Sequence, residues 1–438
     1  MTQAQTKIAL DPWWMPFTAN VAYKSDPWML AKASGVYYET PDGGRILDGV
    51  SGLWCVNAGH CRPEIVEAIS RQAAEMDYAP SFQMGHPIAF EFAERLLSFA
   101  PDHIANVFFS NSGSEAVDTA LKIARAYHRA NGEPDRTILV GRKLGYHGAG
   151  FGGTSVGGFD PHKVPFIPLV PDVAHLPTTH GLEKNRFSRG QPPHGAELAD
   201  ELETVIAEHG EARIGAVIVE PVSGSAGVLV PPVGYLERLA AICKGHGILL
   251  IFDEVITGFG RLGARFAAER FGLEPDMMTV AKGLTNGSVP MAATLLRDGI
   301  YDTVVSASDG IELPHGYTYS GHPLACAAGL ATLSVHEAEG LSERAAALAP
   351  TFEDKLHSLA SAPHVIDVRN LGLMGAIEMD PIGGSPGERA QAIFRSCYDA
   401  GVLIRITGDT IALAPSLVYE EQQLDVLFSA VGDALANQ

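Results

Sequence analysis

The chain has 438 residues, of which 46% are hydrophobic and 19% are charged, as expected for a globular protein of two or three domains. The formal net charge of -20 at pH 7 argues against nucleic acid or an anionic membrane as a partner, because both attract basic surfaces. Five cysteines without a Cys-x-x-Cys pair, and no signal peptide or apolar run of about 20 residues, predict a reduced, cytoplasmic protein.

Short apolar runs alternate with helical patterns through the middle of the chain, which indicates an α/β domain. Several runs are apolar throughout, as is typical of strands buried on both faces of a mainly parallel sheet. The predicted strands are Asn106–Ser110, Thr137–Val140, Val164–Val170, Ile214–Glu220, Ile248–Asp253, Asp276–Ala281 and Met291–Leu296. Helices are predicted over Glu115–Ala130 and Tyr235–Lys244, and a long surface excursion over Pro171–Gly195.

The pattern changes after Pro323 and predicts a smaller α+β domain. Its predicted elements are a helical stretch Leu324–Ala349, strands Val365–Arg369 and Gly375–Met379, a helix Glu388–Ala400, strands Val402–Ile406 and Thr410–Ala414, and a helix Glu420–Ala436. We therefore predict a large parallel-sheet domain over residues 61–325 and a small domain over 326–438, to which residues 1–60 contribute.

Two of the predicted strands end in ionisable residues, Asp253 and Lys282. Ligands of open α/β sheets bind beyond the carboxyl ends of the strands. The two residues are one strand–helix–strand unit apart, so we expect neighbouring or near-neighbouring strand ends. An acid for a pyridinium nitrogen and a lysine that forms an imine are the partners that pyridoxal 5'-phosphate (PLP) needs. The structural alternatives are that Asp253 caps the next element or pairs with a structural arginine, or that Asp253 and Lys282 form a salt bridge with each other.

A third strand end could bind a phosphate group. The segment Ser110–Glu115 joins a strand to a helix, where free N–H groups and the helix dipole attract an anion. Simple N-capping by Ser112 or Ser114 would explain the same residues without a ligand. Tyr146 could offer an aromatic face to a planar cofactor, although a tyrosine is more often part of a core.

Beyond these residues, the sequence resembles the class III, fold-type-I aminotransferases, and closely the ω-amino acid:pyruvate (β-alanine:pyruvate) group. The resemblance extends over nearly the whole chain. It is carried by LDGVSGLWCVNAGH (47–60), FFSNSGSEAVDTALKIA (108–124), GYHG (145–148), LIFDEVITGFGRLG (250–263), TVAKGLTNG (279–287), HGYTYSGHP (315–323) and RITGDTIALAPSL (405–417).

The resemblance implies a role for each residue that would contact PLP. Lys282 would carry the cofactor as a Schiff base and move a proton, and Asp253 would pair with the pyridine nitrogen. Val255 and Tyr146 would lie on either side of the ring. Glu220 would lie near the cofactor hydroxyl or the substrate pocket.

The resemblance also implies a shared phosphate site. Ser112, Gly113 and Ser114 would hold the phosphate, and Thr318 would reach it from a neighbouring subunit. The active form would then be a homodimer or homotetramer with active sites at the interface.

The substrate residues implied by the resemblance are Trp54, which would line the pocket, and Arg405, which would take a carboxylate. Ornithine- and γ-aminobutyrate-type relatives carry an arginine at the position of Ala412. The absence of that arginine argues against the ornithine type and fits the ω-amino acid:pyruvate pattern. This resemblance implies ping-pong transfer of an amino group from a β- or ω-amino acid or an amine to pyruvate, giving L-alanine.

Two other enzyme classes compete with this interpretation. A racemase or aminomutase could use the same fold and cofactor. A nicotinamide oxidoreductase is suggested by Gly-x-Gly-x-x-Gly at Gly258–Gly263 and Gly148–Gly153, but neither match directly follows a first strand and opens a helix. No zinc-binding signature is present in the sequence, and His147 and His322 are interpreted as structural.

Overall fold

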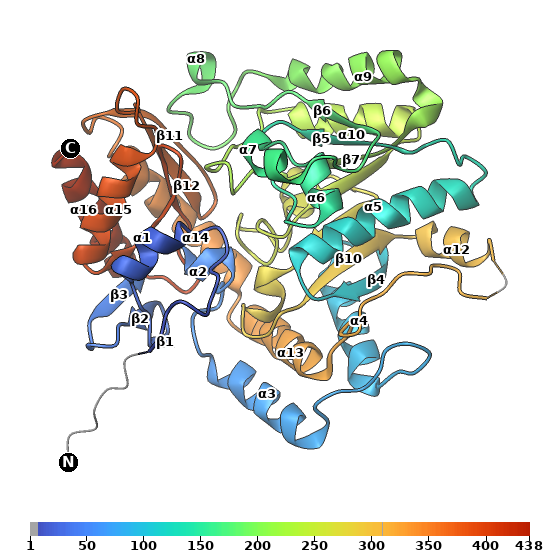
Figure 1. Cartoon of the computed structure of the whole chain (residues 1–438), viewed down its shortest axis with the longest axis horizontal. Helices are drawn as coiled ribbons and strands as arrows, with labels where there is room; N and C mark the ends of the chain where they lie inside the picture. Colours follow the sequence, from blue (N-terminus) through green and yellow to red (C-terminus); the bar gives the residue numbers. More distant parts are fainter. Residues whose placement is uncertain (1–7, 309) are drawn as a thin grey trace.

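The computed structural model describes residues 8–308 and 310–438 and contains three β-sheets. Figure 1 shows a large sheet flanked by helices, next to a smaller C-terminal region that packs beside the first strands of the chain. No helix in the described ranges is both long and apolar enough to cross a bilayer.

The large sheet has seven strands in the order β4-β10-β9-β8-β7-β5-β6. Their bounds are β4 Ile104–Ser110, β5 Ile138–Arg142, β6 Val173–Leu176, β7 Ile214–Val219, β8 Leu249–Asp253, β9 Met277–Val280 and β10 Ala292–Arg297. The strands from β6 to β9 pair in parallel, whereas β10 is antiparallel to both β9 and β4. The predicted mainly parallel sheet and α/β fold class are confirmed.

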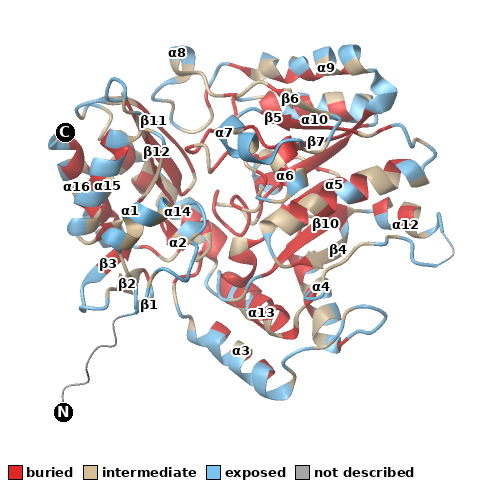
Figure 2. Cartoon of the chain, viewed as in Figure 1, coloured by how far each residue is buried: buried red, intermediate tan, exposed pale blue. Residues whose placement is uncertain are grey.

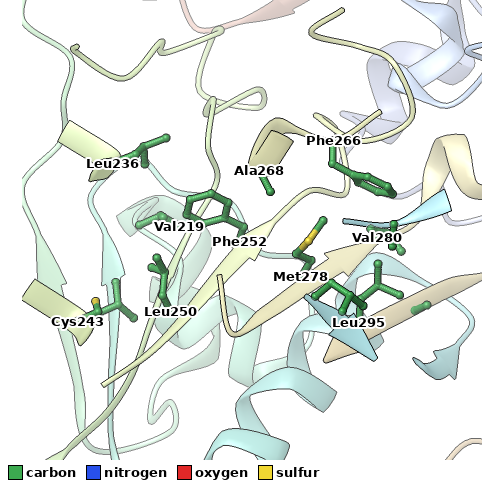
Figure 3. Close-up of a cluster of buried hydrophobic side chains, with 14 of the residues drawn as sticks. Val219, Leu236, Cys243, Leu250, Phe252, Phe266, Ala268, Met278, Val280 and Leu295 are labelled. Carbon is green, nitrogen blue, oxygen red and sulfur yellow. The ribbon is translucent and has the colours of Figure 1, made fainter. Parts of the chain in front are cut away.

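Side chains on both faces of this sheet are buried, because alternate residues of each strand join different hydrophobic clusters. Leu250 and Phe252 of β8 belong to one cluster, and Leu249 and Ile251 to another. Figure 3 shows part of the first cluster, including Phe252, Met278 and Leu295 from three strands. Burial on both faces explains the continuous apolar runs in the sequence.

The helices of this part of the chain precede, connect or follow the strands of the large sheet. They are α3 Pro63–Glu75, α4 Pro87–Phe99, α5 Gly113–Ala130, α6 Phe151–Val156, α7 Asp160–Lys163, α8 Leu182–Asn185, α9 Glu201–His209, α10 Tyr235–Gly245, α11 Ala267–Phe271, α12 Ile300–Val305 and α13 Pro323–Ala338. Buried residues lie on the inner side of α5 and exposed residues face outward, whereas α13 is buried over most of its surface (Figure 2). The two helices predicted between strands correspond to α5 and α10.

The predicted strand Val164–Val170 is wrong. The structure has a 3-10 turn over Val164–Phe166 at this place, and the edge strand of the sheet is β6. Pro165 and Pro168 lack N–H donors and have fixed backbone angles, so the run cannot join a strand ladder despite its apolar character. The predicted surface excursion Pro171–Gly195 correspondingly contains β6 and α8.

The remaining sheets join the two ends of the chain. The C-terminal sheet has the order β11-β12-β15-β14, and the other has the order β1-β2-β3-β13. Their strands are β1 Lys32–Ser34, β2 Tyr37–Glu39, β3 Arg45–Asp48, β11 Val365–Leu371, β12 Met374–Met379, β13 Val402–Leu403, β14 Arg405–Thr407 and β15 Thr410–Leu413. The helices of this region are α1 Asn20–Ser25, α14 Leu341–His357, α15 Glu388–Asp399 and α16 Glu421–Ala436, and the segment labelled α2, Ser51–Trp54, is a turn with non-helical backbone angles at Gly52 and Leu53.

Two predicted elements of the C-terminal region are each split in the structure. The helical stretch Leu324–Ala349 is two helices, α13 and α14, separated at Gly340, whose φ is 57°. The predicted strand Val402–Ile406 becomes β13, which pairs in parallel with β3, and β14, which pairs with β15 in the other sheet. The proposed boundaries of the two domains remain a prediction.

Candidate active site

Asp253 and Lys282 lie at neighbouring strand ends, as their spacing predicted. Asp253 is the last residue of β8, and Lys282 follows the adjacent parallel strand β9. Asp253 pairs in register with Thr279, three positions before Lys282. The two side chains form no ion pair with each other, so the salt-bridge alternative is not observed.

The Asp253 carboxylate is buried and held from three sides. Its Oδ2 atom lies 2.8 Å from His147 Nδ1, and its Oδ1 atom accepts hydrogen bonds from Val255 N and Thr279 Oγ1, both at 3.2 Å. His147 is also buried, and its Nε2 atom has no hydrogen-bond partner. The sequence interpretation did not foresee that His147 contacts Asp253. The Tyr146-His147-Gly148 motif marked this loop as near the cofactor but did not indicate Asp253 as the partner of His147.

Lys282 has a strained backbone and a free amine. Its φ is 47°, in the left-handed region that residues with side chains rarely adopt. No hydrogen bond joins Nζ to another part of the described chain. Burial lowers the pKa of Lys282, although nearby Asp253 and Glu220 oppose the shift. A lowered pKa increases the fraction of neutral amine, which is the nucleophilic form.

These residues line a cavity of about 170 Å³. The cavity also brings together other residues predicted from the sequence, namely Gly113, Ser114, Tyr146, Glu220 and Val255. The sequence interpretation missed four of its lining residues, His147, Gly148, Ile256 and Ala281. Ser112, Trp54, Arg405 and Thr318 lie outside its lining.

One wall of the cavity is the N-terminus of α5. Ser112 is the N-cap of this 18-residue helix, and its hydroxyl accepts a hydrogen bond from Glu115 N at 3.2 Å. Capping by Ser112 is therefore present, as the structural alternative expected. Ser114 Oγ accepts from Ala149 N at 2.9 Å, which joins the helix to the loop after Tyr146. The first turn of α5 presents the positive end of its dipole to the cavity.

Glu220 directly follows β7 and is buried. Its carboxylate accepts hydrogen bonds from Tyr146 N at 2.9 Å and from Gly224 N at 3.1 Å. Burial raises the pKa of Glu220 to about 7, and the nearby charge of Asp253 adds to this effect. Glu220 therefore orients the backbone of Tyr146 and lies beside the cavity.

Arg405 lies over the face of Trp54. The guanidinium carbon is 5.0 Å from the centroid of the ring, within the range of a cation–π contact. Arg405 on β14 is the cross-strand partner of Ala412 on β15, so both side chains lie on one face of the sheet. The Nε atom of Arg405 is buried without a partner, and burial lowers the pKa of this guanidinium. Burial also raises the pKa of Tyr146, whereas nearby Arg405 opposes that shift.

Thr318 is exposed on the loop between α12 and α13 and does not reach the cavity of its own chain. Its carbonyl oxygen accepts a hydrogen bond from Tyr78 OH at 3.2 Å.

The polar groups around the cavity fit PLP. A free amine lies on one strand end, a buried carboxylate on the next, and a helix N-terminus faces the same space. These groups match the aldehyde, the pyridine nitrogen and the phosphate of PLP respectively. The fold and the cavity thus define a PLP-dependent enzyme of fold type I.

Comparison with known proteins identifies the family. Residues 18–435 match the family model "Aminotransferase class-III". The chain is 58% identical over 423 residues to an omega-aminotransferase from Caulobacter vibrioides, with 96% of each protein covered. It is 48% identical to a beta-alanine–pyruvate aminotransferase from Pseudomonas aeruginosa, with 98% of this chain and 96% of that protein covered.

A solved structure supports the same assignment. A PLP-bound amine transaminase from an uncultivated Pseudomonas species superposes with a TM-score of 0.91 at 38% identity, covering 98% of this chain and 99% of that one. The chain belongs to the class III aminotransferase family and is a PLP-dependent aminotransferase. This result does not favour the nicotinamide oxidoreductase, the racemase or the aminomutase.

Proposed function

We propose that this enzyme transfers the amino group of a β- or ω-amino acid, or of a simple amine, to pyruvate, giving L-alanine and an aldehyde, ketone or oxo acid. The names of the relatives from Caulobacter vibrioides and Pseudomonas aeruginosa support this substrate class. The observation that carries it is the pairing of Arg405 with Trp54 on the sheet face that includes Ala412.

Lys282 is proposed to bind the cofactor covalently and to move the proton at the substrate carbon. Bound PLP supplies an electron sink that stabilises negative charge at this carbon. The burial that lowers the pKa of Lys282 favours the neutral amine, which can attack a carbonyl carbon and accept a proton. Asp253 lines the same cavity and would pair with the pyridine nitrogen of the cofactor.

Other residues in or next to the cavity are proposed to orient the cofactor. Ser112, Gly113 and Ser114 at the start of α5 offer backbone N–H groups and hydroxyls to a phosphate. Tyr146 and Val255 would pack against the two faces of the ring. Glu220 fixes the backbone of Tyr146 through its 2.9 Å hydrogen bond, and its raised pKa allows it to share a proton with the cofactor hydroxyl.

Arg405 is proposed to bind the substrate carboxylate. No acidic side chain within the described ranges forms an ion pair with Arg405, and a partly buried guanidinium without a counter-ion favours an anionic ligand. A guanidinium can hold a carboxylate such as that of pyruvate through two parallel hydrogen bonds.

Trp54 is proposed to form the apolar wall of the pocket. Its indole is 1% exposed and contacts Arg405 on one face. Arg369 on β11 lies in the same cross-strand row as Ala412 and Arg405, but its guanidinium is ion-paired with Asp367 and Glu378. Because Ala412 has no charged group, Arg405 is the guanidinium of this row that can meet a substrate carboxylate. A single movable cation next to an apolar wall can accept donors whose carboxylates lie at different distances, or donors without one.

The test measures two half-reactions separately through the cofactor spectrum. One is the transfer of the amino group from the donor to the enzyme, and the other is its transfer from the enzyme to pyruvate. Arg405→Ala is expected to raise KM for pyruvate by about 10- to 100-fold, the scale of a lost charge-assisted hydrogen bond. The half-reaction of an amine without a carboxylate should change little. Arg395→Ala is the matched control, because Arg395 stacks on Trp28, 5.5 Å from its ring centroid, on α15.

Two results would overturn the substrate assignment. The first is an equal slowing of both half-reactions in Arg405→Ala. The second is a higher activity of the unmodified enzyme with 2-oxoglutarate than with pyruvate. Membership of the aminotransferase family would stand in either case.

We also propose that the active form is a symmetric homodimer, or a multiple of it such as a tetramer. Thr318 would complete the phosphate site of the neighbouring subunit, which its position outside the lining of its own chain's cavity supports. Large apolar side chains near this loop are exposed, including Phe82, Met84, Phe90 and Tyr319. The first three line a hollow of about 510 Å³ that a second copy could fill.

A further inference from the structure

The segment Ser51–His60, which carries Trp54, has an unfavourable backbone conformation next to the active site. Ser51 and Trp54 have φ values of 50° and 56°, in the left-handed region, and Gly52 between them has a φ of 67°. Residues with side chains adopt this region only when surrounding contacts enforce it. The contacts that hold this segment therefore decide where the Trp54 ring lies.

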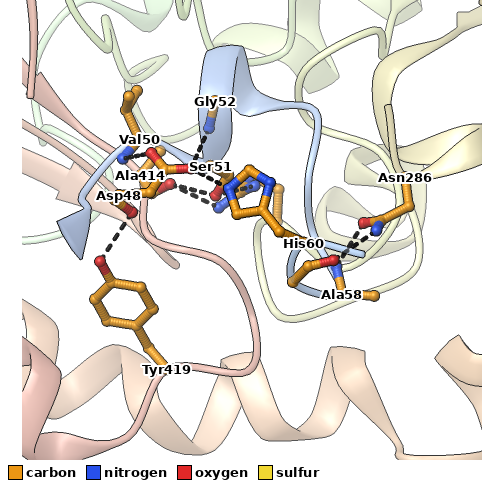
Figure 4. Close-up of polar contacts among 11 residues, drawn as sticks. Asp48, Val50, Ser51, Gly52, Ala58, His60, Asn286, Ala414 and Tyr419 are labelled. Carbon is orange, nitrogen blue, oxygen red and sulfur yellow. Dashed lines mark hydrogen bonds and ion pairs between the residues drawn. The ribbon is translucent and has the colours of Figure 1, made fainter. Parts of the chain in front are cut away.

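Asn286 holds the end of this segment. Its Oδ1 atom accepts a hydrogen bond from Ala58 N at 2.8 Å, and its Nδ2 atom donates to Gly59 O at 2.8 Å. Figure 4 shows the Asn286 side chain directed at Ala58. Asn286 is buried and follows the 3-10 turn Lys282–Thr285, so it lies four residues after the proposed catalytic lysine.

Arg261 holds the same segment from the loop that follows Asp253. Its guanidinium donates to Asn57 Oδ1 at 2.6 Å and to Ser51 Oγ at 3.1 Å. It also donates to the backbone oxygens of Ala414 and Pro415, just beyond β15.

Arg261 is 0% exposed, and no described carboxylate lies within ion-pair distance of it. A fully buried cation that has only neutral acceptors is costly, which argues for a specific role. Burial correspondingly lowers the pKa of Arg261 to about 10.

The turn that carries Lys282 also packs directly against Asn57. A Cβ atom added at Gly283 would lie 2.8 Å from Asn57 Nδ2 and 2.9 Å from Phe259 Cβ. Asn57 Nδ2 in turn donates to Phe259 O at 2.8 Å. Asn57 is therefore fixed between the loop after Asp253 and the turn that begins at Lys282.

We propose that Asn286 and Arg261 are positioning residues that fix the Trp54 wall relative to the Asp253 and Lys282 strand ends, and so determine which amines fit the pocket. We call Asn286, Arg261 and Asn57 the clamp. The role of Trp54 as a pocket wall depends on the proposed function. The hydrogen bonds that hold the segment Ser51–His60 in place do not depend on it.

The test uses Asn286→Gly in the PLP-loaded enzyme. Glycine accepts the φ of 52° at this position without strain, so the variant removes the two side-chain hydrogen bonds and little else. Thr285→Val is the matched control, because Thr285 is its buried neighbour and loses one hydrogen bond, to Val289 O, that does not reach the segment. Asn57→Ala tests the Arg261 side of the clamp and replaces Asn286→Gly if that variant fails to fold.

The first measurement is hydrogen exchange of the peptide that covers residues 51–60. Asn286→Gly is expected to speed its exchange by about tenfold, because Ala58 N loses its acceptor. The second measurement compares kcat/KM for a bulky aryl amine and for β-alanine. The ratio of the two should shift by about fivefold or more, mainly through KM, because the pocket wall moves while the reacting groups stay in place.

Unchanged exchange over residues 51–60 in both clamp variants, or an equal acceleration in Thr285→Val, would overturn the proposal. Faster exchange with an unchanged amine ratio would overturn the positioning role, since the residues would then serve stability alone. The exchange measurement involves no substrate. A preference for 2-oxoglutarate would therefore refute the substrate assignment and leave the result on the clamp intact.

Discussion

Replacing His147 by alanine removes the closest hydrogen bond that Asp253 receives. His147 Nδ1 lies 2.8 Å from the carboxylate, whereas the other two donors are both at 3.2 Å. The ring is buried, and Nε2 has no partner, so its contact with Asp253 is the polar interaction that orients it. The variant therefore perturbs the Asp253 carboxylate and removes part of the cavity wall, but leaves Tyr146 and Val255, which would pack on the cofactor ring, in place.

The expected size of the effect follows from the charge of the acceptor. A hydrogen bond to a charged group contributes about 1.5–3 kcal/mol when its partner is buried. If this energy is lost from the transition state, the rate falls by about 10- to 100-fold. Because Val255 N and Thr279 Oγ1 still hold the carboxylate, His147→Ala should retain more activity than a variant that removes the acid itself.

The assay is a single-turnover half-reaction with a saturating amine donor, together with the affinity of the apoenzyme for PLP. His322→Ala serves as the control, because His322 was also interpreted as structural. Its Nδ1 accepts a hydrogen bond from Leu324 N at the start of α13. A His147→Ala rate within twofold of the unmodified enzyme, or an equal loss in His322→Ala, would refute the reasoning.

Other predictions address the proposed roles directly. Lys282→Ala should abolish turnover while the protein still folds, and near-normal transamination by this variant would reject the mechanism. Asp253→Asn should lower kcat by at least about 10²-fold, the scale of losing a key electrostatic partner; a merely twofold loss would show that the assignment is wrong. Dilution followed by sedimentation and activity measurements should show that activity falls as the assembly dissociates, and a fully active monomer would contradict the role of Thr318.

The sequence predicts the large sheet well because each strand is marked by a pattern of neighbouring residues. Continuous apolar runs mark the strands β7, β8 and β9, and their burial on both faces explains this pattern. Asp253 and Lys282 are recognisable because a charged residue ends such a run. Hydrophobicity alone fails at Val164–Val170, where the backbone constraints of proline prevail.

The contacts that organise the site are less accessible to sequence reasoning. Arg261 meets Asn57, and His147 meets Asp253, across long stretches of chain. Nothing in the local pattern of either residue encodes its partner, because the meeting depends on how the strands are ordered in the sheet. The separation of β13 from β14 has the same origin, since the pairing partner of β13 lies near the other end of the chain.

The parallel pairing of β13 with β3 has a consequence for folding during synthesis. Val402 pairs with Leu47, and Leu403 with Asp48, so this sheet gains its last strand only after most of the chain has left the ribosome. All strands of the large sheet are complete by Arg297. We expect the large sheet to form first during translation, with the early strands β1 to β3 waiting for their partner. Nascent chains stalled before residue 402 should therefore leave residues 32–48 sensitive to protease.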